Sequence, residues 1–113
     1  MGSATGERAG AVLRLLGLAR RAGRLRLGSG PVLRALSHEG PGVVFLARDA
    51  GADLRRRVTR ALGPSRLDDT TFVVEDLAAA FGRERLATVS VHDRDFVAGL
   101  MRYLGEPPQE CDR

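Results

Sequence analysis

The sequence contains no lysine, isoleucine, asparagine or tryptophan, and it has a single cysteine. With Cys111 alone, the chain can form no internal disulfide, so its stability has to come from a packed core. No apolar run approaches the roughly 20 residues that a membrane span needs. Residues 1–8 also lack the basic and then apolar pattern of a secretory signal. These absences favour a monomeric cytoplasmic domain that does not enter a membrane.

Motifs of the common enzyme classes are absent as well. The chain has no G-x-S-x-G elbow, no G-x-x-x-x-G-K-[ST] loop and no G-x-G-x-x-G fingerprint. Gly28-Ser29-Gly30 is similar to part of a phosphate loop, but a glycine turn at a helix start explains it better. His38 and His92 have no neighbouring cysteine, which argues against a zinc site. Acids at Asp93-Arg94-Asp95 could hold magnesium, but at that place they more often cap a helix. We therefore expect no enzyme, no metal site and no cofactor.

Arginine supplies all eighteen basic residues. Lysine, isoleucine and asparagine share A/T-rich codons, so their absence is what a GC-rich genome produces. Whatever its cause, the planar guanidinium group pairs with phosphate through two bonds and stacks on bases. Residues 1–34 carry seven arginines against Glu7 alone, whereas residues 67–113 carry five arginines against ten acids. This gradient predicts a positive face that attracts a polyanion, although an unevenly charged solvated surface also fits it.

Hydrophobic periodicity predicts alternating helices and strands. Helices are expected over residues 7–22, 28–39, 52–62, 76–81 and 93–104, and strands over 24–27, 42–47, 71–74 and 87–91. Residues 1–8 are expected to form a flexible leader, 9–104 a single domain and 105–113 a polar tail. Short connections and buried strands indicate an α/β fold, a three-layer α/β/α sandwich with a small mixed sheet of about four strands.

Several local features follow from the same patterns. Gly23 is expected to end the first helix, and Ser29 or Gly30 to cap the second. The last helix is expected to bury Phe96, Leu100, Tyr103 and Leu104. The strands at 42–47, 71–74 and 87–91 are expected to lie side by side in one sheet, with helices on both faces.

The basic residues around the second helix are the most informative cluster. Arg20, Arg21, Arg24 and Arg26 precede the glycine turn, and Arg34 follows it on the exposed helix face. A helix N-terminus presents free backbone N–H groups to anions, and nearby guanidinium groups strengthen that attraction. The spacing of the few aromatic residues places most of them in the core, which disfavours base stacking. The cluster therefore predicts a cradle for the phosphate backbone.

A family resemblance appears at this point. The segments over residues 15–25, 32–36, 43–50 and 87–93 resemble the YlxQ-like bacterial branch of the L-seven-Ae ribosomal-protein superfamily, and the similarity spans about residues 9–104. The resemblance implies an α/β/α sandwich and recognition of kink-turn RNA. It also implies a motif at the start of the second helix, with a glycine, a small polar residue, Asn, Glu, two variable residues and Lys.

Gly28, Ser29 and Arg34 match the glycine, the small polar residue and the lysine of that motif. Gly30 and Pro31 stand where the base-reading Asn and Glu would be, and proline also lacks a backbone donor. The loop that covers extruded bases in the family maps to Val91, His92 and the residues after them. The expected RNA-binding set is thus Arg20, Arg21, Arg24, Arg26, Gly28, Ser29, Gly30, Arg34, Val91 and His92.

These observations predict a non-catalytic protein that binds ribosomal RNA or another structured RNA, with the ribosome as a candidate assembly. Phosphate contacts would supply affinity and register rather than sequence readout. The alternative is a protein-interaction module of the transcription–translation machinery that has kept the fold and lost kink-turn recognition. A contiguous arginine patch around residues 28–34 would favour RNA, whereas scattered arginines and an exposed apolar patch would favour a protein partner.

Overall fold

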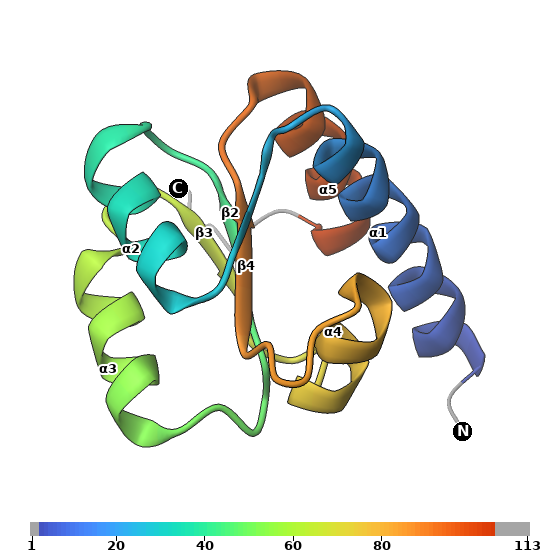
Figure 1. Cartoon of the computed structure of the whole chain (residues 1–113). Helices are drawn as coiled ribbons and strands as arrows, with labels where there is room; N and C mark the ends of the chain where they lie inside the picture. Colours follow the sequence, from blue (N-terminus) through green and yellow to red (C-terminus); the bar gives the residue numbers. More distant parts are fainter. Residues whose placement is uncertain (1–2, 106–113) are drawn as a thin grey trace, which may run out of the picture.

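The computed structural model describes residues 3–105, which form five helices and four strands (Figure 1). The helices are α1 (Ser3–Arg21), α2 (Ser29–His38), α3 (Ala52–Ala61), α4 (Val74–Phe81) and α5 (Arg94–Leu104). The strands are β1 (Leu25–Leu27), β2 (Val43–Leu46), β3 (Arg66–Asp68) and β4 (Thr88–Val91). Within this part of the chain, no helix combines the length and the apolar character that crossing a bilayer requires.

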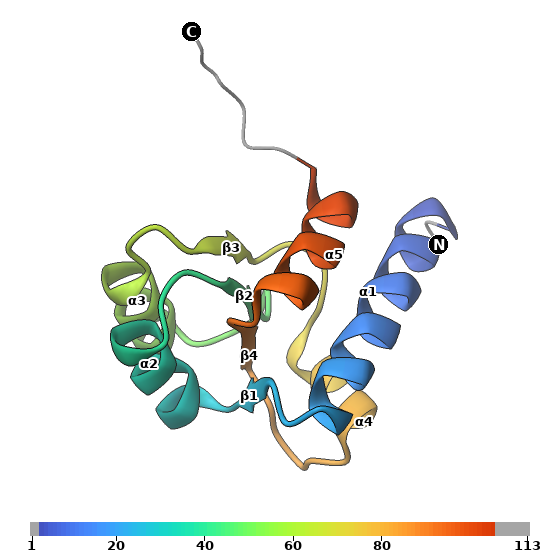
Figure 2. The same cartoon turned by 90° about the horizontal axis from the view of Figure 1, so that it is seen from above.

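The strands form one mixed sheet in the order β1-β4-β2-β3. Strand β4 is antiparallel to both of its neighbours, and β3 is parallel to β2. Helices α2 and α3 cover one face of the sheet, and α1, α4 and α5 cover the other (Figures 1 and 2). The three-layer α/β/α sandwich with a four-stranded mixed sheet is therefore confirmed.

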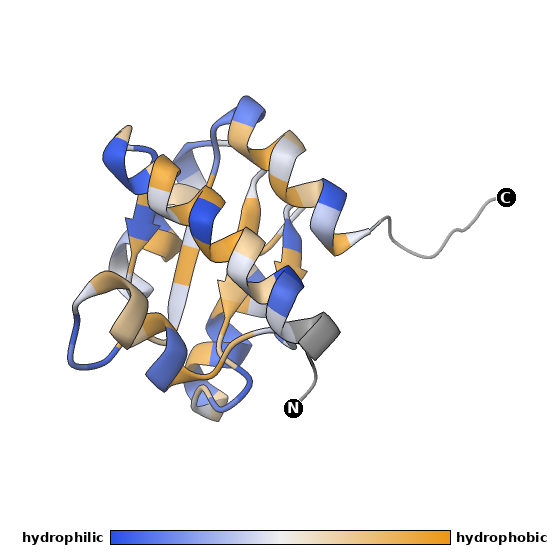
Figure 3. Ribbon diagram, turned by 90° about the vertical axis from the view of Figure 1, so that its right-hand side faces the viewer, coloured by the Kyte–Doolittle hydropathy of each residue, from blue (hydrophilic) through white to orange (hydrophobic). Residues whose placement is uncertain are grey.

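The continuous apolar run of β2 is explained by burial on both faces. Val43 and Phe45 belong to the core cluster beneath α1, α4 and α5, whereas Val44 and Leu46 belong to the cluster beneath α2 and α3. Successive residues of a strand point to opposite faces, so a strand covered on both sides must be apolar at every position. Figure 3 shows the central strands coloured mostly as hydrophobic, with strongly hydrophilic segments at loops and helix ends.

A glycine defines the end of α1, and an aspartate defines the start of α5. Gly23 has φ +75°, and the chain leaves α1 through hydrogen bonds from Gly23 N to Arg20 O (3.0 Å) and from Arg24 N to Ala19 O (2.8 Å). This is the expected glycine-terminated helix end. Asp93 caps α5, since its carboxylate accepts from the N–H groups of Asp95 (2.9 Å) and Phe96 (3.4 Å).

The N-cap of α2 differs from the expectation. Gly28 occupies the cap position, with φ +96° and ψ 164°, in place of Ser29 or Gly30. Only glycine adopts this conformation cheaply, so the turn between β1 and α2 depends on the absence of a side chain. Among the described residues 3–105, no side chain accepts a hydrogen bond from the first turn of α2.

The strand expected over residues 71–74 is absent, and β3 lies at Arg66–Asp68 instead. The apolar segment is buried for another reason: Phe72 packs edge-on against Phe45, with ring centroids 5.7 Å apart, from a loop. Its carbonyl accepts from Arg48 N (2.8 Å), and Val74 already begins α4. An apolar run indicates burial, and burial does not require strand pairing, because a loop that packs against the sheet can bury the same side chains.

Two expectations at the ends of the domain also need correction. Helix α1 begins at Ser3, so residues 3–8 are helical and do not form a flexible leader. Arg8 contributes here, because its guanidinium donates to Thr71 Oγ1 (3.3 Å) and to the carbonyl of Tyr103 (3.4 Å) at the end of α5. Tyr103 itself is 41% exposed rather than buried. Most of the expected polar tail, residues 106–113, lies outside the described residues.

Candidate nucleic-acid interface

The start of α2 is the centre of the expected site, and its backbone is open to solvent. Gly28 donates its N–H to the carbonyl of Thr88 (2.9 Å), and its own carbonyl accepts from Val32 N (3.0 Å). The next two N–H groups, on exposed Ser29 and half-buried Gly30, point out of the first turn without a capping side chain. Such groups attract an anion, because they are unsatisfied donors at the positive end of the helix dipole. The expected turn at Gly28 is confirmed.

Arg34 adds a positive charge directly above this turn. Its Nη1 lies 3.6 Å from the point that a Cβ on Gly30 would occupy, so the guanidinium covers the first turn of the helix. Arg34 is exposed, and within residues 3–105 its guanidinium forms no ion pair. Two backbone donors and one guanidinium therefore converge on the same stretch of surface, which is an arrangement suited to a phosphate group.

The loop between α4 and β4, residues 82–87, ends next to the start of α2. Gly28 N donates to the carbonyl of Thr88, which follows the loop, and Ala47 N donates to the carbonyl of Ala87, the last loop residue (2.8 Å). The loop carries Arg83 and Arg85, which were not in the expected site. Both are exposed and line a hollow beside α4 together with Asp49, Glu75 and Glu84. Antiparallel pairing of β1 with β4 brings the end of β1 to the beginning of β4. An expectation of this pairing would have placed the end of the α4–β4 loop near Gly28.

Arg20 and Arg21 occupy the last turn of α1. Arg20 reaches to α4, where its Nη1 donates to the carbonyl of Phe81 (3.0 Å) and its guanidinium lies 5.8 Å from the centre of the Phe81 ring. Because Phe81 immediately precedes the α4–β4 loop, Arg20 lies at the beginning of that loop. Arg21 is exposed on α1. Of this pair, only Arg20 is held near the loop by contacts.

Arg24, Val91 and His92 lie at the opposite end of β1 and β4. The register pairs Leu25 with Val91 and Leu27 with Val89, so the residues around Leu25 are remote from the beginning of β4. Arg24 forms an ion pair with Asp93 (3.6 Å) at the start of α5. The expectation that Arg24 lies at the N-terminus of α2 is therefore wrong. Arg26, in the middle of β1, lines a hollow with Pro31 and Arg34 of α2.

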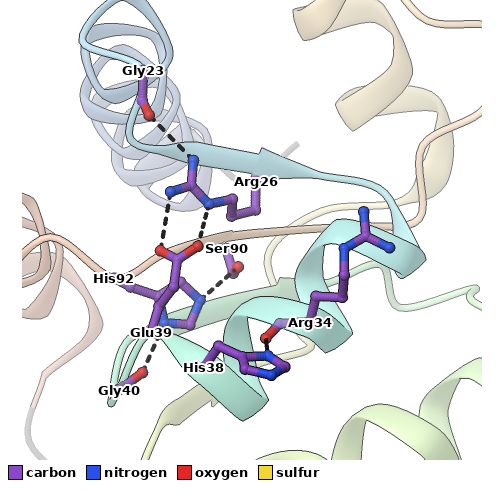
Figure 4. Close-up of polar contacts among 8 residues, drawn as sticks. All are labelled: Gly23, Arg26, Arg34, His38, Glu39, Gly40, Ser90 and His92. Carbon is purple, nitrogen blue, oxygen red and sulfur yellow. Dashed lines mark hydrogen bonds and ion pairs between the residues drawn. The ribbon is translucent and has the colours of Figure 1, made fainter.

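Arg26 is also occupied by an acid (Figure 4). Its Nε and Nη2 donate to the two carboxylate oxygens of Glu39 (2.8 and 3.0 Å), and Nη1 donates to the Gly23 carbonyl (3.1 Å). The hydrogen bonds from Arg26 hold the pKa of the Glu39 carboxyl below its usual value, against a smaller opposing effect of burial. The same pair raises the pKa of Arg26. Although Arg26 and Arg34 line one shallow hollow between β1 and α2, only Arg34 is free of a carboxylate partner there.

His92 connects β4 to the loop after α2 (Figure 4). Its Nδ1 lies 2.9 Å from the Gly40 carbonyl, and its Nε2 lies 2.9 Å from Ser90 Oγ. Since a carbonyl only accepts, Nδ1 carries a hydrogen and donates it to Gly40. Val91 is fully buried. Both residues are thus held by the fold and are not placed beside Gly28–Gly30, contrary to the expected grouping.

The described residues, 3–105, contain no group of three His, Cys, Asp or Glu side chains arranged to hold a metal ion. What the site offers is a set of hydrogen-bond donors and guanidinium groups. The arrangement can bind an anion by charge and by backbone donors.

The sequence matches no family model and no curated protein. Among solved structures, the chain is similar to a protein of unknown function from Bacillus halodurans C, at 26% identity and with a TM-score of 0.65. The similarity covers 84% of this chain and 97% of that chain. The two proteins therefore share nearly the whole α/β fold.

Proposed function

We propose that this protein is a non-catalytic, cytoplasmic RNA-binding protein that recognises structured RNA, ribosomal or other, through its phosphate backbone. The observation that carries the proposal is the uncapped first turn of α2 beneath the guanidinium of Arg34. Arg83 and Arg85 of the adjacent α4–β4 loop extend this site. Together they form the phosphate-binding site, defined by Gly28, Ser29, Gly30, Arg34, Arg83 and Arg85.

Phosphate contact is favoured over base readout by what the site lacks. Gly30 and Pro31 carry no side-chain group that could hydrogen-bond to a base edge. Phe45, Phe72 and Phe81 are buried in the core, so they provide no stacking platform. Affinity would then depend on charge and shape, with a strong dependence on salt because bound phosphates release counterions.

The resemblance to the L-seven-Ae superfamily supports the same proposal. The three-layer fold agrees with what the resemblance implies, and the phosphate-binding site includes the matched residues Gly28, Ser29 and Arg34. We infer that the chain is a divergent, YlxQ-like member that retains RNA binding. Because Gly30 and Pro31 replace the base-reading pair, we expect it to bind kink-turn and other structured RNAs with similar affinity.

The alternative function, docking a protein partner, has weaker support. In the part of the chain that the structure describes, the exposed large apolar side chains are Leu18 and Tyr103. Tyr103 lies near Arg8, whose guanidinium reaches its carbonyl, and Leu18 lies ten residues further along α1, about 15 Å at the rise of a helix. These two side chains are too far apart to form one apolar patch, whereas the guanidinium of Arg34 lies over the first turn of α2 with its backbone donors.

The test is a titration of the protein against two labelled RNA hairpins over a series of salt concentrations. One hairpin contains a kink-turn, and the other has its G·A pairs replaced by Watson–Crick pairs. We expect similar affinities for both and a linear fall of log affinity with log salt, with a slope of about −0.9 per phosphate contact if RNA follows the duplex DNA value. A strong preference for the kink-turn would contradict the phosphate-dominated account. No binding at low salt would reject RNA binding and favour a protein partner.

A further inference from the structure

The two helical layers differ in charge. Helices α2 and α3 together contain five arginines and a single acid, Asp53, whereas α1, α4 and α5 contain six arginines and four acids. The excess of positive charge in the first layer is concentrated on α3, which holds four of its five arginines. A helix layer with this imbalance attracts anions over a wider area than the phosphate-binding site alone.

Three of the four arginines of α3 form an exposed group. Arg55 is turned toward the sheet edge, where it pairs with Asp69 (2.6 Å) and donates to the carbonyls of Ala47 and Arg48. Arg56, Arg57 and Arg60 instead point away from the buried Val58. We call Arg56, Arg57 and Arg60 the α3 basic face.

One carboxylate cannot neutralise this group. Asp53 pairs with both Arg56 (2.8 Å) and Arg57 (3.8 Å), and its side chain is 71% exposed. Arg60 is exposed and forms no ion pair within residues 3–105. Ion pairs at this degree of exposure are weak and are screened by salt, so the three guanidinium groups remain available to a stronger polyanion.

The helices that carry the α3 basic face and the phosphate-binding site both begin at the same end of the sheet, where β1 and β2 end. Strands β1 and β2 are both antiparallel to β4, so they run in the same direction, and α2 and α3 follow them directly. In Figure 1 both helices run upward from their N-termini, and the start of α2 lies higher in the view than the start of α3; the two helices contact each other. A rigid polyanion that contacts the start of α2 can therefore continue along α3.

We propose that the α3 basic face is a second contact surface for the phosphate backbone of a double-stranded RNA arm that extends from the phosphate-binding site. This proposal rests on the proposed function. Arg56 and Arg60, four residues apart, project from one side of the helix about 6 Å apart along its axis and can contact separate phosphates. The helix contains no aromatic residue that could stack on unpaired bases.

A protein partner fits this surface less well. Stable protein interfaces usually bury apolar or aromatic anchors at their centre. The exposed residues of α3 are charged, or small, such as Ala52 and Thr59, and its larger apolar side chains, Leu54 and Val58, pack in the core cluster shared with α2. A flat, charged surface without an anchor matches a hydrated phosphate backbone better than a protein.

The test compares two triple variants with the same change of net charge. The first replaces the basic face, with Arg56→Gln, Arg57→Gln and Arg60→Gln. The control replaces three exposed arginines on the other side of the sheet, with Arg14→Gln, Arg94→Gln and Arg102→Gln. Each protein is titrated against hairpins with duplex arms of about 10 and about 20 base pairs, roughly one and two helical turns. Circular dichroism establishes that both variants are folded.

We expect the wild-type protein and the control to bind the longer arm more tightly than the shorter one. The α3 variant should lose this gain, and on the longer arm its slope of log affinity against log salt should become shallower by up to about 3, near 0.9 for each lost contact. Asp53→Asn, which removes the only acid of this layer, should tighten binding to the longer arm and steepen the slope.

Other results would overturn the proposal. The proposal is wrong if the α3 variant binds both arms with the same affinity as the control. It is also wrong if the wild-type protein binds the two arms equally. Neither result would contradict the phosphate-binding site on α2. Polyglutamate serves as a model of an acidic protein. If the α3 variant loses affinity for polyglutamate but still binds the longer RNA arm more tightly than the shorter one, the surface binds an acidic protein and the proposal is wrong. Absence of any RNA binding by the wild-type protein would reject the proposed function together with this inference.

Discussion

Gly28 and Thr88 are joined by a hydrogen bond of 2.9 Å from the Gly28 N–H to the Thr88 carbonyl. This contact extends the pairing of β1 with β4 up to the first residue of α2, and it places the start of that helix beside the α4–β4 loop. His92 follows the other end of β4 and contacts the Gly40 carbonyl instead. The expected site residues around Gly28 and those around His92 therefore lie at opposite ends of one short strand.

The first prediction concerns the α4–β4 loop. The double substitution Arg83→Gln and Arg85→Gln should weaken binding to every structured RNA, because each arginine contributes to the charge beside the α2 N-terminus. The salt slope should become shallower by about 0.9 for each phosphate contact that is lost. Affinity measured at several salt concentrations checks this, together with a thermal melt that should be unchanged for two exposed side chains.

His92→Ala provides the contrast to that double variant. It removes the hydrogen bond that joins the end of β4 to Gly40 in the loop after α2, and a second one to Ser90 within β4, so we expect a loss of about 1–3 kcal/mol in the free energy of unfolding. At a temperature where the variant is folded, its RNA affinity should equal that of the wild type. If His92→Ala weakened RNA binding more than the arginine pair, the RNA would lie at the other end of β4.

The sequence was sufficient for most of the fold because local physical constraints are strong there. A strand covered on both faces needs an unbroken apolar run, as at Val43–Leu46. A helix that ends in a residue with positive φ favours glycine there, as at Gly23 and Gly82. The segment around Phe72 shows the limit of this reasoning. Apolar residues there are buried from a loop, and periodicity reports burial rather than hydrogen-bonded pairing.

The site was predictable only in its local part. Gly28, Ser29, Gly30 and Arg34 lie within two turns of one helix, so their proximity follows from sequence spacing. The partners of Arg24 and Arg26, which are Asp93 and Glu39, depend on strand register and on the turn after α2. Such non-local ion pairs cannot be derived from the charge of a segment. For that reason Arg24 and Arg26 were expected to be free for RNA, although in the fold each pairs with an acid.

The second prediction follows from the pairing of Glu39 with Arg26. Because the pKa of Glu39 is lowered in the folded protein, its charged form stabilises the fold above the ordinary carboxyl pKa of about 4.3, and this stabilisation is lost as the pH falls through the lowered value. Glu39 is 37% exposed, so we expect Glu39→Gln to cost at most about 1 kcal/mol at neutral pH. Urea unfolding at neutral and acidic pH measures the difference, which should shrink in acid.

The same substitution should increase RNA affinity. It releases the guanidinium of Arg26 into the hollow that it shares with Arg34, and it adds a positive charge to that surface. Glu7→Gln, which changes the net charge equally on exposed α1, is the control. Equal gains from both substitutions would mean that overall charge, and not the released Arg26, strengthens binding.

The third prediction concerns Asp68, which is 7% exposed at the end of β3. Its carboxylate accepts from Thr70 N (2.8 Å), Thr70 Oγ1 (3.1 Å) and Thr71 Oγ1 (2.6 Å). Asp68→Ala leaves the buried Thr71 hydroxyl without its acceptor, so the free energy of unfolding should fall by about 1–3 kcal/mol. Replacing its half-buried neighbour Asp69 by Ala should cost at most about 1 kcal/mol, because that carboxylate is 38% exposed. Since β3 is at the far edge of the sheet from β1, RNA affinity should be the same in both variants.

The last prediction tests how the phosphate-binding site recognises RNA. Arg34→Ala removes the guanidinium above the first turn of α2, and the loss should be similar for a kink-turn hairpin and for a hairpin without G·A pairs. A phosphate contact carries no base information, whereas a side chain that reads a base would give a selective loss of about 1–3 kcal/mol, by analogy with base contacts on DNA. Arg102→Ala on α5, an exposed arginine on the other side of the sheet, is the matched control. A loss confined to the kink-turn RNA would show that Arg34 helps to read the G·A pairs, as the lysine of the family motif does, and the phosphate-only account would then be wrong.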